Sequence, residues 1–454
     1  MAAGGGGDNN GSSLEYTPTW AVAAVCPFIV IISFVLERAI YFLAKVLKKK
    51  DKKLLLETLE RVKEELMLLG FMSFLVPAFK GAIGKICVPI HFTHHMLPCK
   101  KERAEIATAT GHCAAKGKVP LLSQEGFDDL DTFIFVLAIV HFFLSLITVI
   151  LGEAKIYQWK HWEDAIKHSY NSEWEVSDSR VTPVIAHAFI RDHFQGIGKH
   201  SAIVGWLVSF FKQFQGSVNK FDYITLRHGF INKHCRRNPN FGFHRYMVGA
   251  LEDDYKRVVG ISWYHWIFVV IFLLLNVHGW NAYFWMAFIP LILLLAVGAK
   301  LEHVISQLAH EVAEKHVAIE GDLVVRPSDD HFWFHRPCLV LHLIHFILFQ
   351  NAFEIAVFFW ILITFGFDSC IMGKVGYIIP RLVIGVIVQV VCSYSTLPLY
   401  AIVTQMGTSF KKAIFDKHVQ EGLVRWAQKA KERKGVQTVE TVPVTWDQQV
   451  VSPQ

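Results

Sequence analysis

The sequence predicts an all-α membrane protein with seven transmembrane helices, an N-terminus outside the cell and a cytosolic C-terminus. Composition is the first observation: 53% of the 454 residues are hydrophobic and only 19% are charged, whereas soluble proteins carry about 25% charged residues. The second observation is that the apolar residues gather in runs that approach the roughly 20 residues of a membrane-spanning helix. The third is that basic residues concentrate beside these runs, which predicts the side that each loop faces.

The first apolar run gives the predicted orientation. Residues 1–19 contain no Lys or Arg and are expected to form an extracellular tail. The apolar run at 20–36 is followed by a cluster of lysines between positions 45 and 53. Positive residues near the end of a span stay in the cytosol, so the N-terminus is predicted to lie outside.

Residues 20–403 are expected to form a seven-span membrane domain. Its spans are predicted at 20–36, 66–79, 132–152, 263–277, 283–299, 338–365 and 377–403. The second run is short for a span and is interrupted by Pro77 and Lys80, so the pattern does not define where it ends. Residues 153–262 are too long for a simple turn and predict a cytosolic domain or collar.

The cysteines divide by predicted compartment. Cys87, Cys99 and Cys113 fall in the outer loop between spans two and three, and Cys370 falls in the outer turn before span seven. Four cysteines in an oxidising compartment suggest two disulfides, one of which ties the loop to the turn. Three pairings are open, and the sequence does not choose among them. The cysteines expected to be free are Cys26, Cys235, Cys338 and Cys392.

A basic amphipathic segment, residues 404–435, follows the last apolar run. Phe415, Val419, Leu423 and Trp426 recur at helical spacing and share one face, while basic residues dominate the remaining surface. Such a helix is typical of a segment that lies on membrane lipids or of a calmodulin target. Both interpretations stay open on the residue pattern. The residues expected to contact the partner are Phe410, Lys411, Lys412, Ile414, Phe415, Val419, Leu423, Arg425, Trp426 and Lys429. Residues 436–454 are expected to be a disordered cytosolic tail.

Ionisable residues also occur inside the predicted spans. Glu354 lies midway along span six, after His345, and Arg381 lies in span seven. Such residues are costly in a membrane and are functional candidates by default. One hypothesis is an ion or proton path lined by Glu354 and His345, with Arg381 as the counter-charge. The alternative is a structural ion pair or other polar contact between helices, with the Arg381 side chain extending outward to the membrane surface.

Enzymatic chemistry is not indicated. His310 and His316 flank two glutamates, but they are six residues apart and do not share a helix face, so they do not form a zinc motif. No nucleophile motif, phosphate loop or paired-carboxylate motif is evident, and we therefore predict no enzyme activity, no metal and no cofactor. The net charge of +6 is modest and does not indicate nucleic-acid binding. Whether the chain forms homo-oligomers is left open by the sequence.

Six stretches occur in a distinctive order along the chain. They are residues 14–20 (LEYTPTW), 62–71 (VKEELMLLGF), 85–89 (KICVP), 158–163 (QWKHWE), 326–334 (RPSDDHFWF) and 376–383 (GYIIPRLV). In this order, from about residue 13 to residue 435, the chain resembles the plant MLO family of powdery-mildew susceptibility proteins.

The resemblance implies seven spans, an outside N-terminus, a plasma-membrane location and paired outer cysteines. It also implies that the segment after the last span binds calmodulin, with Leu423 and Trp426 as the residues most needed. Members of this family are linked to pathogen defence, leaf cell death and the growth or reception of pollen tubes. Calcium-channel activity has been proposed for some. A receptor-like role and a role as a trafficking scaffold are also open. Pro77 and Lys80 depart from the family's usual second span.

Overall fold

A computed structural model of the chain describes residues 38, 41–42, 44–49, single positions and short runs between 56 and 83, 85–89, 113, 118–120, 124–172, 218–235, 241–275, 286, 288–318, 332–366, 378–407, 411–415 and 420. The chain divides into two compact units, residues 1–60 and 61–454. In the first unit, the described residues between 38 and 49 are helical. The second unit contains all the named helices and strands.

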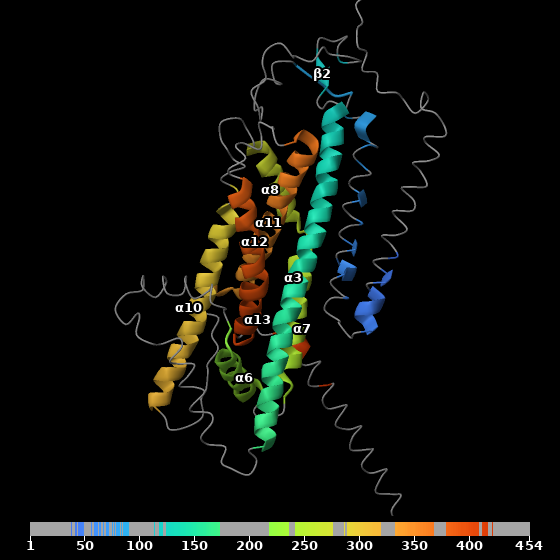
Figure 1. Ribbon diagram of the computed structural model, residues 1–454. Helices are drawn as coiled ribbons and strands as arrows, with labels where there is room; N and C mark the ends of the chain where they lie inside the picture. The colour runs from blue at the N-terminus through green and yellow to red at the C-terminus, as the bar shows by residue number, and fades with distance from the viewer. Residues whose placement is uncertain are drawn as a thin grey trace, which may run out of the picture. The chain divides into compact units, whose positions relative to one another are not determined.

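The second unit is a bundle of long helices (Figure 1). Its elements are β1 (Cys87–Val88), β2 (Val119–Pro120), α3 (Gln124–Ser172), α6 (Lys220–His234), α7 (Phe243–Val259), α8 (Trp263–Leu275), α10 (Phe288–Ala318), η7 (Trp333–His335), α11 (Pro337–Phe365), α12 (Ile378–Val391), the π-helical turn η9 (Cys392–Thr396) and α13 (Leu397–Gln405). The antiparallel pair β1–β2 lies near the start of α3, which we call the disulfide end. The opposite end, where α13 finishes, is called the tail end.

Five stretches of the described residues are long and apolar enough to cross a membrane. They are Glu125–Lys167, Phe243–Leu273, Phe288–Leu308, Pro337–Phe365 and Ile378–Gln405. Each of the predicted spans three to seven overlaps one of these stretches. The predicted spans at 20–36 and 66–79 lie wholly or largely outside the described residues. The structure therefore supports a helical, multi-pass membrane protein, while the number of seven spans and the orientation stay predictions.

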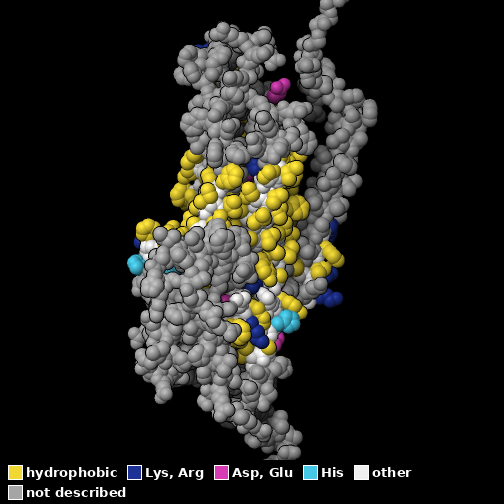
Figure 2. Space-filling view, turned by 60° about the vertical axis from the view of Figure 1, so that its left-hand side comes forward, with side chains coloured by type: hydrophobic (Ala, Val, Ile, Leu, Met, Phe, Trp, Pro, Cys, Tyr) yellow, Lys and Arg dark blue, Asp and Glu magenta, His cyan; other side chains and the backbone are white. Residues whose placement is uncertain are grey.

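The middle of the bundle is apolar on its outside. Figure 2 shows hydrophobic side chains spread across the middle of one face. Large apolar side chains that are exposed on three helices are Phe135, Phe143 and Ile150 of α3, Ile267 and Val270 of α8, and Val383, Val386 and Val390 of α12. A soluble monomer rarely exposes so large an apolar surface. Lipid accounts for it, because acyl chains solvate these side chains without cost.

The interior packs around the contact between α3 and α11. Phe353 of α11 meets Phe133 of α3 edge-to-face, with ring centroids 6.1 Å apart, and meets Phe272 of α8 at 4.9 Å. Trp360 Nε1 also donates a hydrogen bond to the Asp129 carbonyl at 3.0 Å. Lipid is as apolar as these side chains, so close packing and such hydrogen bonds, rather than escape from water, hold the helices together.

Gly152 allows the closest approach between α3 and α7. A Cβ built at this glycine would overlap the hydroxyl and ring of Tyr255. Any larger residue would push α7 away from α3. The glycine is thus required by packing rather than by its own backbone conformation.

The described part of the predicted loop 153–262 is helical and packs at the tail end. We call this region the collar: residues 153–172 of α3 together with α6, α7 and Phe241, which lies two residues before α7. Glu163 is buried, and its carboxylate accepts hydrogen bonds from Arg227 Nε at 3.1 Å and from Tyr223 Oη at 3.2 Å. Burial and the neighbouring carboxylate raise the pKa of Tyr223 far above its usual value, so its hydroxyl stays a donor at every physiological pH. This ion pair joins α3 to α6.

The collar ion pair should contribute strongly to stability. Arg227→Met leaves the buried Glu163 carboxylate without its main counter-charge, which typically costs about 3–5 kcal/mol. We expect the double variant Glu163→Gln/Arg227→Met to recover part of this loss, because it leaves no unpaired charge. Thermal and denaturant unfolding of the purified protein in detergent measures both effects.

Arg61→Met is the matched control for this experiment. It removes the same side chain from an exposed pair with Glu64, where the expected loss is below about 1 kcal/mol. Equal losses for Arg227→Met and Arg61→Met would contradict a stabilising role for the buried pair.

Candidate functional site

The chain that follows the last helix turns back onto the collar. We call residues 411–415 the tail start. Lys411 Nζ donates to Asp254 Oδ1 at 2.6 Å and to the Ala250 carbonyl at 2.6 Å, and it lies 2.9 Å from Asp253 Oδ2. All three acceptors belong to α7. Asp254 is almost fully buried, with a side chain only 2% exposed, and the charge of Lys411 offsets part of the cost of burying its carboxylate.

A second polar contact joins the tail start to the end of α13. Gln405 is buried, and its Oε1 accepts hydrogen bonds from the Tyr246 hydroxyl at 2.6 Å and from the Lys411 backbone N–H at 3.1 Å. One amide oxygen therefore connects α7, α13 and the tail start.

The apolar side of the tail start faces an aromatic cluster of the collar. The Phe415 ring lies 5.5 Å from Phe241, 6.1 Å from Phe230 and 6.2 Å from Tyr246, measured between ring centroids. The three collar rings are buried. Ile414 is half-buried beside Gly249 of α7, and Lys412 is exposed. The remaining residues of the predicted binding segment lie outside the described residues: Phe410, Val419, Leu423, Arg425, Trp426 and Lys429.

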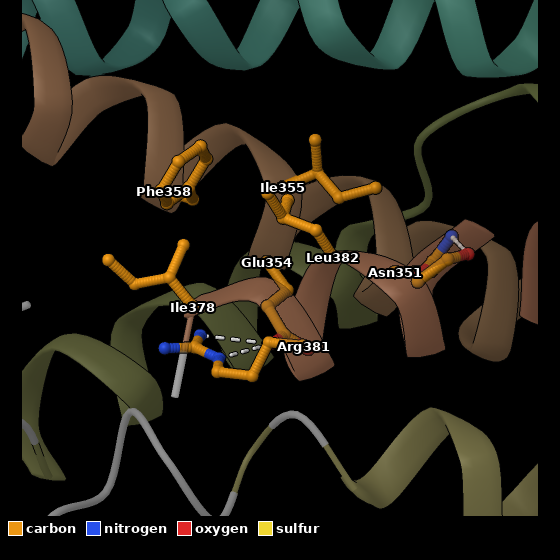
Figure 3. A pocket seen from close by; sticks show the side chains of 8 residues that line it. Asn351, Glu354, Ile355, Phe358, Ile378, Arg381 and Leu382 are labelled. Atoms are coloured by element: carbon orange, nitrogen blue, oxygen red, sulfur yellow. Dashed lines mark hydrogen bonds and ion pairs between the residues drawn. The ribbon is translucent and has the colours of Figure 1, made fainter. Parts of the chain in front are cut away.

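The predicted intramembrane charges meet in the bundle. Arg381 of α12 donates from Nε and Nη2 to Glu354 Oε1 of α11, at 3.0 and 2.9 Å. Both side chains are about nine-tenths buried. Figure 3 shows the two groups facing each other at a pocket that Asn351 also lines. Pairing lowers the cost of holding either charge at membrane depth.

Further polar side chains continue from this pair toward the tail end. Asn351 Nδ2 donates to Gln389 Oε1 at 3.1 Å, and Gln389 Nε2 donates to Thr148 Oγ1 at 2.7 Å. The Ser393 hydroxyl lies 3.3 Å from Thr148 Oγ1, and Ser393 belongs to the π-helical turn η9. We call these six residues, including Glu354 and Arg381, the polar seam. A second pocket, lined by His141, Thr148 and Gln389 among others, lies beside it.

His345 does not join the polar seam. Its Nε2 donates to the Gly260 carbonyl, and its Nδ1 accepts a hydrogen bond from the Tyr264 hydroxyl at 2.8 Å. His345 and Glu354 are nine residues apart on α11, which places them on nearly opposite faces at about 100° per residue. The structure thus brings Glu354 and Arg381 together and places His345 at the junction between α7 and α8.

Cys87 and Cys113 form a disulfide beside the β1–β2 pair. Of the three pairings left open by the sequence, this bond is compatible only with the one that joins Cys99 to Cys370, and both of those residues lie outside the described residues. Cys235, Cys338 and Cys392 are free, as predicted, whereas Cys26 is not described. Burial raises the pKa of the Cys235 thiol to about 11, which makes it unreactive near neutral pH.

The sequence identified Glu354 and Arg381 but not the rest of the polar seam. The remaining polar residues, Gln389, Thr148 and Ser393, each occur singly in an apolar run. A single polar residue is a weak indication of a contact between helices, because its side chain often hydrogen-bonds the backbone of its own helix. Nothing in the sequence indicated that Asp253 and Asp254 contact Lys411, because Lys411 lies 157 positions beyond Asp254. Among the described residues, no group of three or more His, Cys, Asp or Glu side chains is placed to hold a metal ion.

The Glu354–Arg381 pair should behave as a coupled unit. Arg381→Met leaves Glu354 unpaired and is expected to destabilise the protein by roughly 3 kcal/mol, the scale of an intramembrane charge. Adding Glu354→Gln should restore part of that loss. A double-mutant cycle on detergent unfolding measures the coupling, and strictly additive effects would show that the two groups act independently.

Comparison with known proteins identifies the family. The model of the Mlo family matches residues 11–453. MLO-like protein 1 of Arabidopsis thaliana is 59% identical over 463 residues, covering 94% of this chain and 88% of the relative. MLO protein homolog 1 of Oryza sativa subsp. japonica is 41% identical over 447 residues, covering 95% and 82%. No solved structure shows significant similarity to the chain. The chain therefore belongs to the Mlo family.

Proposed function

We propose that this protein acts in the plasma membrane, where it modulates pathogen defence and cell death, and that Ca²⁺-dependent binding of calmodulin to residues 404–435 regulates it. The observation that carries the proposal is the position of the basic amphipathic segment. It overlaps the last two residues of the final candidate span, which ends at Gln405, and continues beyond them. Family membership supports the same role.

The segment suits calmodulin chemically. Ca²⁺-loaded calmodulin opens Met-rich apolar grooves, which would accept the face of Phe415, Val419, Leu423 and Trp426. Its acidic rim would meet the surrounding lysines and arginines. In this arrangement Leu423 and Trp426 act as the main apolar anchors.

Membrane lipid is the competing partner for the same surface. Each basic residue near an anionic leaflet contributes about 1 kcal/mol of binding free energy to the lipid. The segment starts close to the end of a candidate span, so the leaflet is within its reach. The two partners are compatible if calmodulin lifts the segment from the lipid, as in an electrostatic switch. We propose calmodulin as the regulatory partner and lipid as the resting one, with the segment facing the cytosol.

Replacing both anchors should abolish calmodulin binding. Leu423→Arg with Trp426→Arg puts two charges on the apolar face, and we expect at least a hundredfold loss of Ca²⁺-dependent affinity, the scale of losing two hot-spot side chains. Binding of labelled calmodulin to the full-length protein in nanodiscs, with Ca²⁺ and with chelator, measures it.

The control is Gln420→Arg with Gln428→Arg, which adds the same charges away from the apolar face. This variant should bind calmodulin as well as the wild type does. If the anchor variant retained wild-type affinity, the calmodulin site would have to lie elsewhere in the chain.

A calcium-permeable channel is the second candidate function. The polar seam favours it, because buried polar side chains of α3, α11 and α12 follow one another through an apolar bundle, and such residues often mark ion pathways. The pocket at Glu354 holds space for about one water molecule, so conduction would require the helices to separate. No enzymatic reaction is proposed.

Neutralising Glu354 tests whether the polar seam conducts ions. If it does, Glu354→Gln should lower Ca²⁺ entry and current by about tenfold or more. The loss of one electrostatic contact with the ion, worth about 1.4 kcal/mol, corresponds to a factor of ten. Calcium imaging and patch recording in cells that express each form at equal surface levels measure it.

Glu125→Gln, an exposed glutamate at the start of α3, is the control and should leave currents unchanged. Absence of current in the wild type as well as in Glu354→Gln would overturn the channel function. Such a result would favour a receptor-like protein or a trafficking scaffold that acts through the collar and the tail.

A further inference from the structure

Two separate contacts hold the tail start on the collar. The first is electrostatic: Lys411 reaches Asp254 and Asp253 of α7, and its own side chain is only 18% exposed. The second is apolar: the Phe415 ring enters the aromatic cluster of Phe230, Phe241 and Tyr246. A charge-assisted hydrogen bond to a buried carboxylate is among the stronger contacts a side chain makes.

The side chains that make these contacts are also needed for calmodulin. Phe415 is the first member of the apolar face that runs on to Trp426. Calmodulin accepts such a face in its own grooves, so one ring cannot occupy both the collar and calmodulin. Lys411 likewise cannot meet the acidic rim of calmodulin while it neutralises Asp254.

We propose that the collar is an intramolecular competitor for calmodulin: docking of Lys411 and Phe415 on α6 and α7 latches the start of the calmodulin-binding segment, and calmodulin must release this latch to bind. This inference rests on the proposed function. It adds a regulatory step that depends on the collar rather than on the segment itself.

The latch lowers the apparent affinity of the protein for calmodulin. When only a fraction of molecules is competent to bind, the apparent Kd rises by the inverse of that fraction. The coupling is reciprocal, so bound calmodulin must also weaken docking of the tail start. Since α7 and α8 together make up the candidate membrane stretch Phe243–Leu273, the freed collar face lies at one end of that stretch.

Gly249 offers a way to open the latch from the collar side. A Cβ built on this α7 residue meets Ile414 Cγ2 of the tail start at 3.1 Å, and no other described atom outside its own helix lies within 4 Å. Gly249→Leu therefore presses on the tail start. Leucine is also a better helix former than glycine by about 0.5–1 kcal/mol, so α7 should keep its fold. Asp254→Asn is the second variant and removes the more buried of the two carboxylates that hold Lys411.

The experiment compares calmodulin binding by full-length proteins in nanodiscs at saturating Ca²⁺. Gly249→Leu and Asp254→Asn should each bind labelled calmodulin about tenfold more tightly than the wild type, the gain expected if about a tenth of wild-type molecules are unlatched. Asp164→Asn, which removes a carboxylate from an exposed position of α3, is the charge-matched control and should bind like the wild type. Neither collar variant changes the sequence of residues 404–435.

The possible results separate the latch from the proposed function. Tighter binding by Gly249→Leu, with Asp164→Asn unchanged, supports the latch. Equal Ca²⁺-dependent affinity of the wild type and Gly249→Leu overturns the latch and leaves calmodulin regulation standing. Failure of the wild type and of both collar variants to bind Ca²⁺-calmodulin overturns the proposed regulation and the latch with it. If Asp254→Asn does not fold, Gly249→Leu decides the question alone.

Discussion

The bundle depends on one constraint: lipid offers no hydrogen-bond partners, so buried polar groups in a membrane depend on partners within the protein. Gln389 illustrates this in the middle of α12. Its Nε2 donates to Thr148 Oγ1 at 2.7 Å and to the Leu144 carbonyl at 3.1 Å, while its Oε1 accepts from Asn351. These bonds tie α3, α11 and α12 together at one level. Because lipid could replace none of them, they specify how the three helices are rotated against one another.

The collar solves a different problem at the tail end of the bundle. Here the buried charges are matched between segments that are distant in sequence, Glu163 with Arg227 and Asp254 with Lys411. Removing one member of such a pair leaves an uncompensated buried charge, which is far worse than removing both. Each pair therefore stabilises the collar when both of its members are in place. In the Asp254 pair, one partner belongs to the segment that we propose calmodulin binds.

Sequence patterns predicted the positions of spans three to seven, which fall on described helices, because span formation is a local property. Length and hydropathy are carried by consecutive residues, and the predicted runs 338–365 and 377–403 nearly coincide with α11 and with the stretch from α12 to α13. Spacing on a helix could also have separated His345 from Glu354, since nine residues place them on opposite faces. Arg381 was anticipated as the counter-charge of Glu354 within the ion-path hypothesis, whereas its outward extension, which the alternative included, was wrong because its guanidinium is buried against Glu354. Gln389 and Thr148 were not anticipated, because a single polar residue in an apolar run does not reveal what it faces.

The sequence by itself determined the helical membrane character, the resemblance to the MLO family and the amphipathic pattern after the last span. Each of these properties depends on consecutive or regularly spaced residues. Only the tertiary structure decided that Cys87 bonds Cys113, that Glu354 meets Arg381 and that Lys411 docks on Asp254. The physical reason is that each contact joins separate segments of the chain. Which side chains meet across such distances depends on how whole helices pack, and no local pattern of residues encodes that packing.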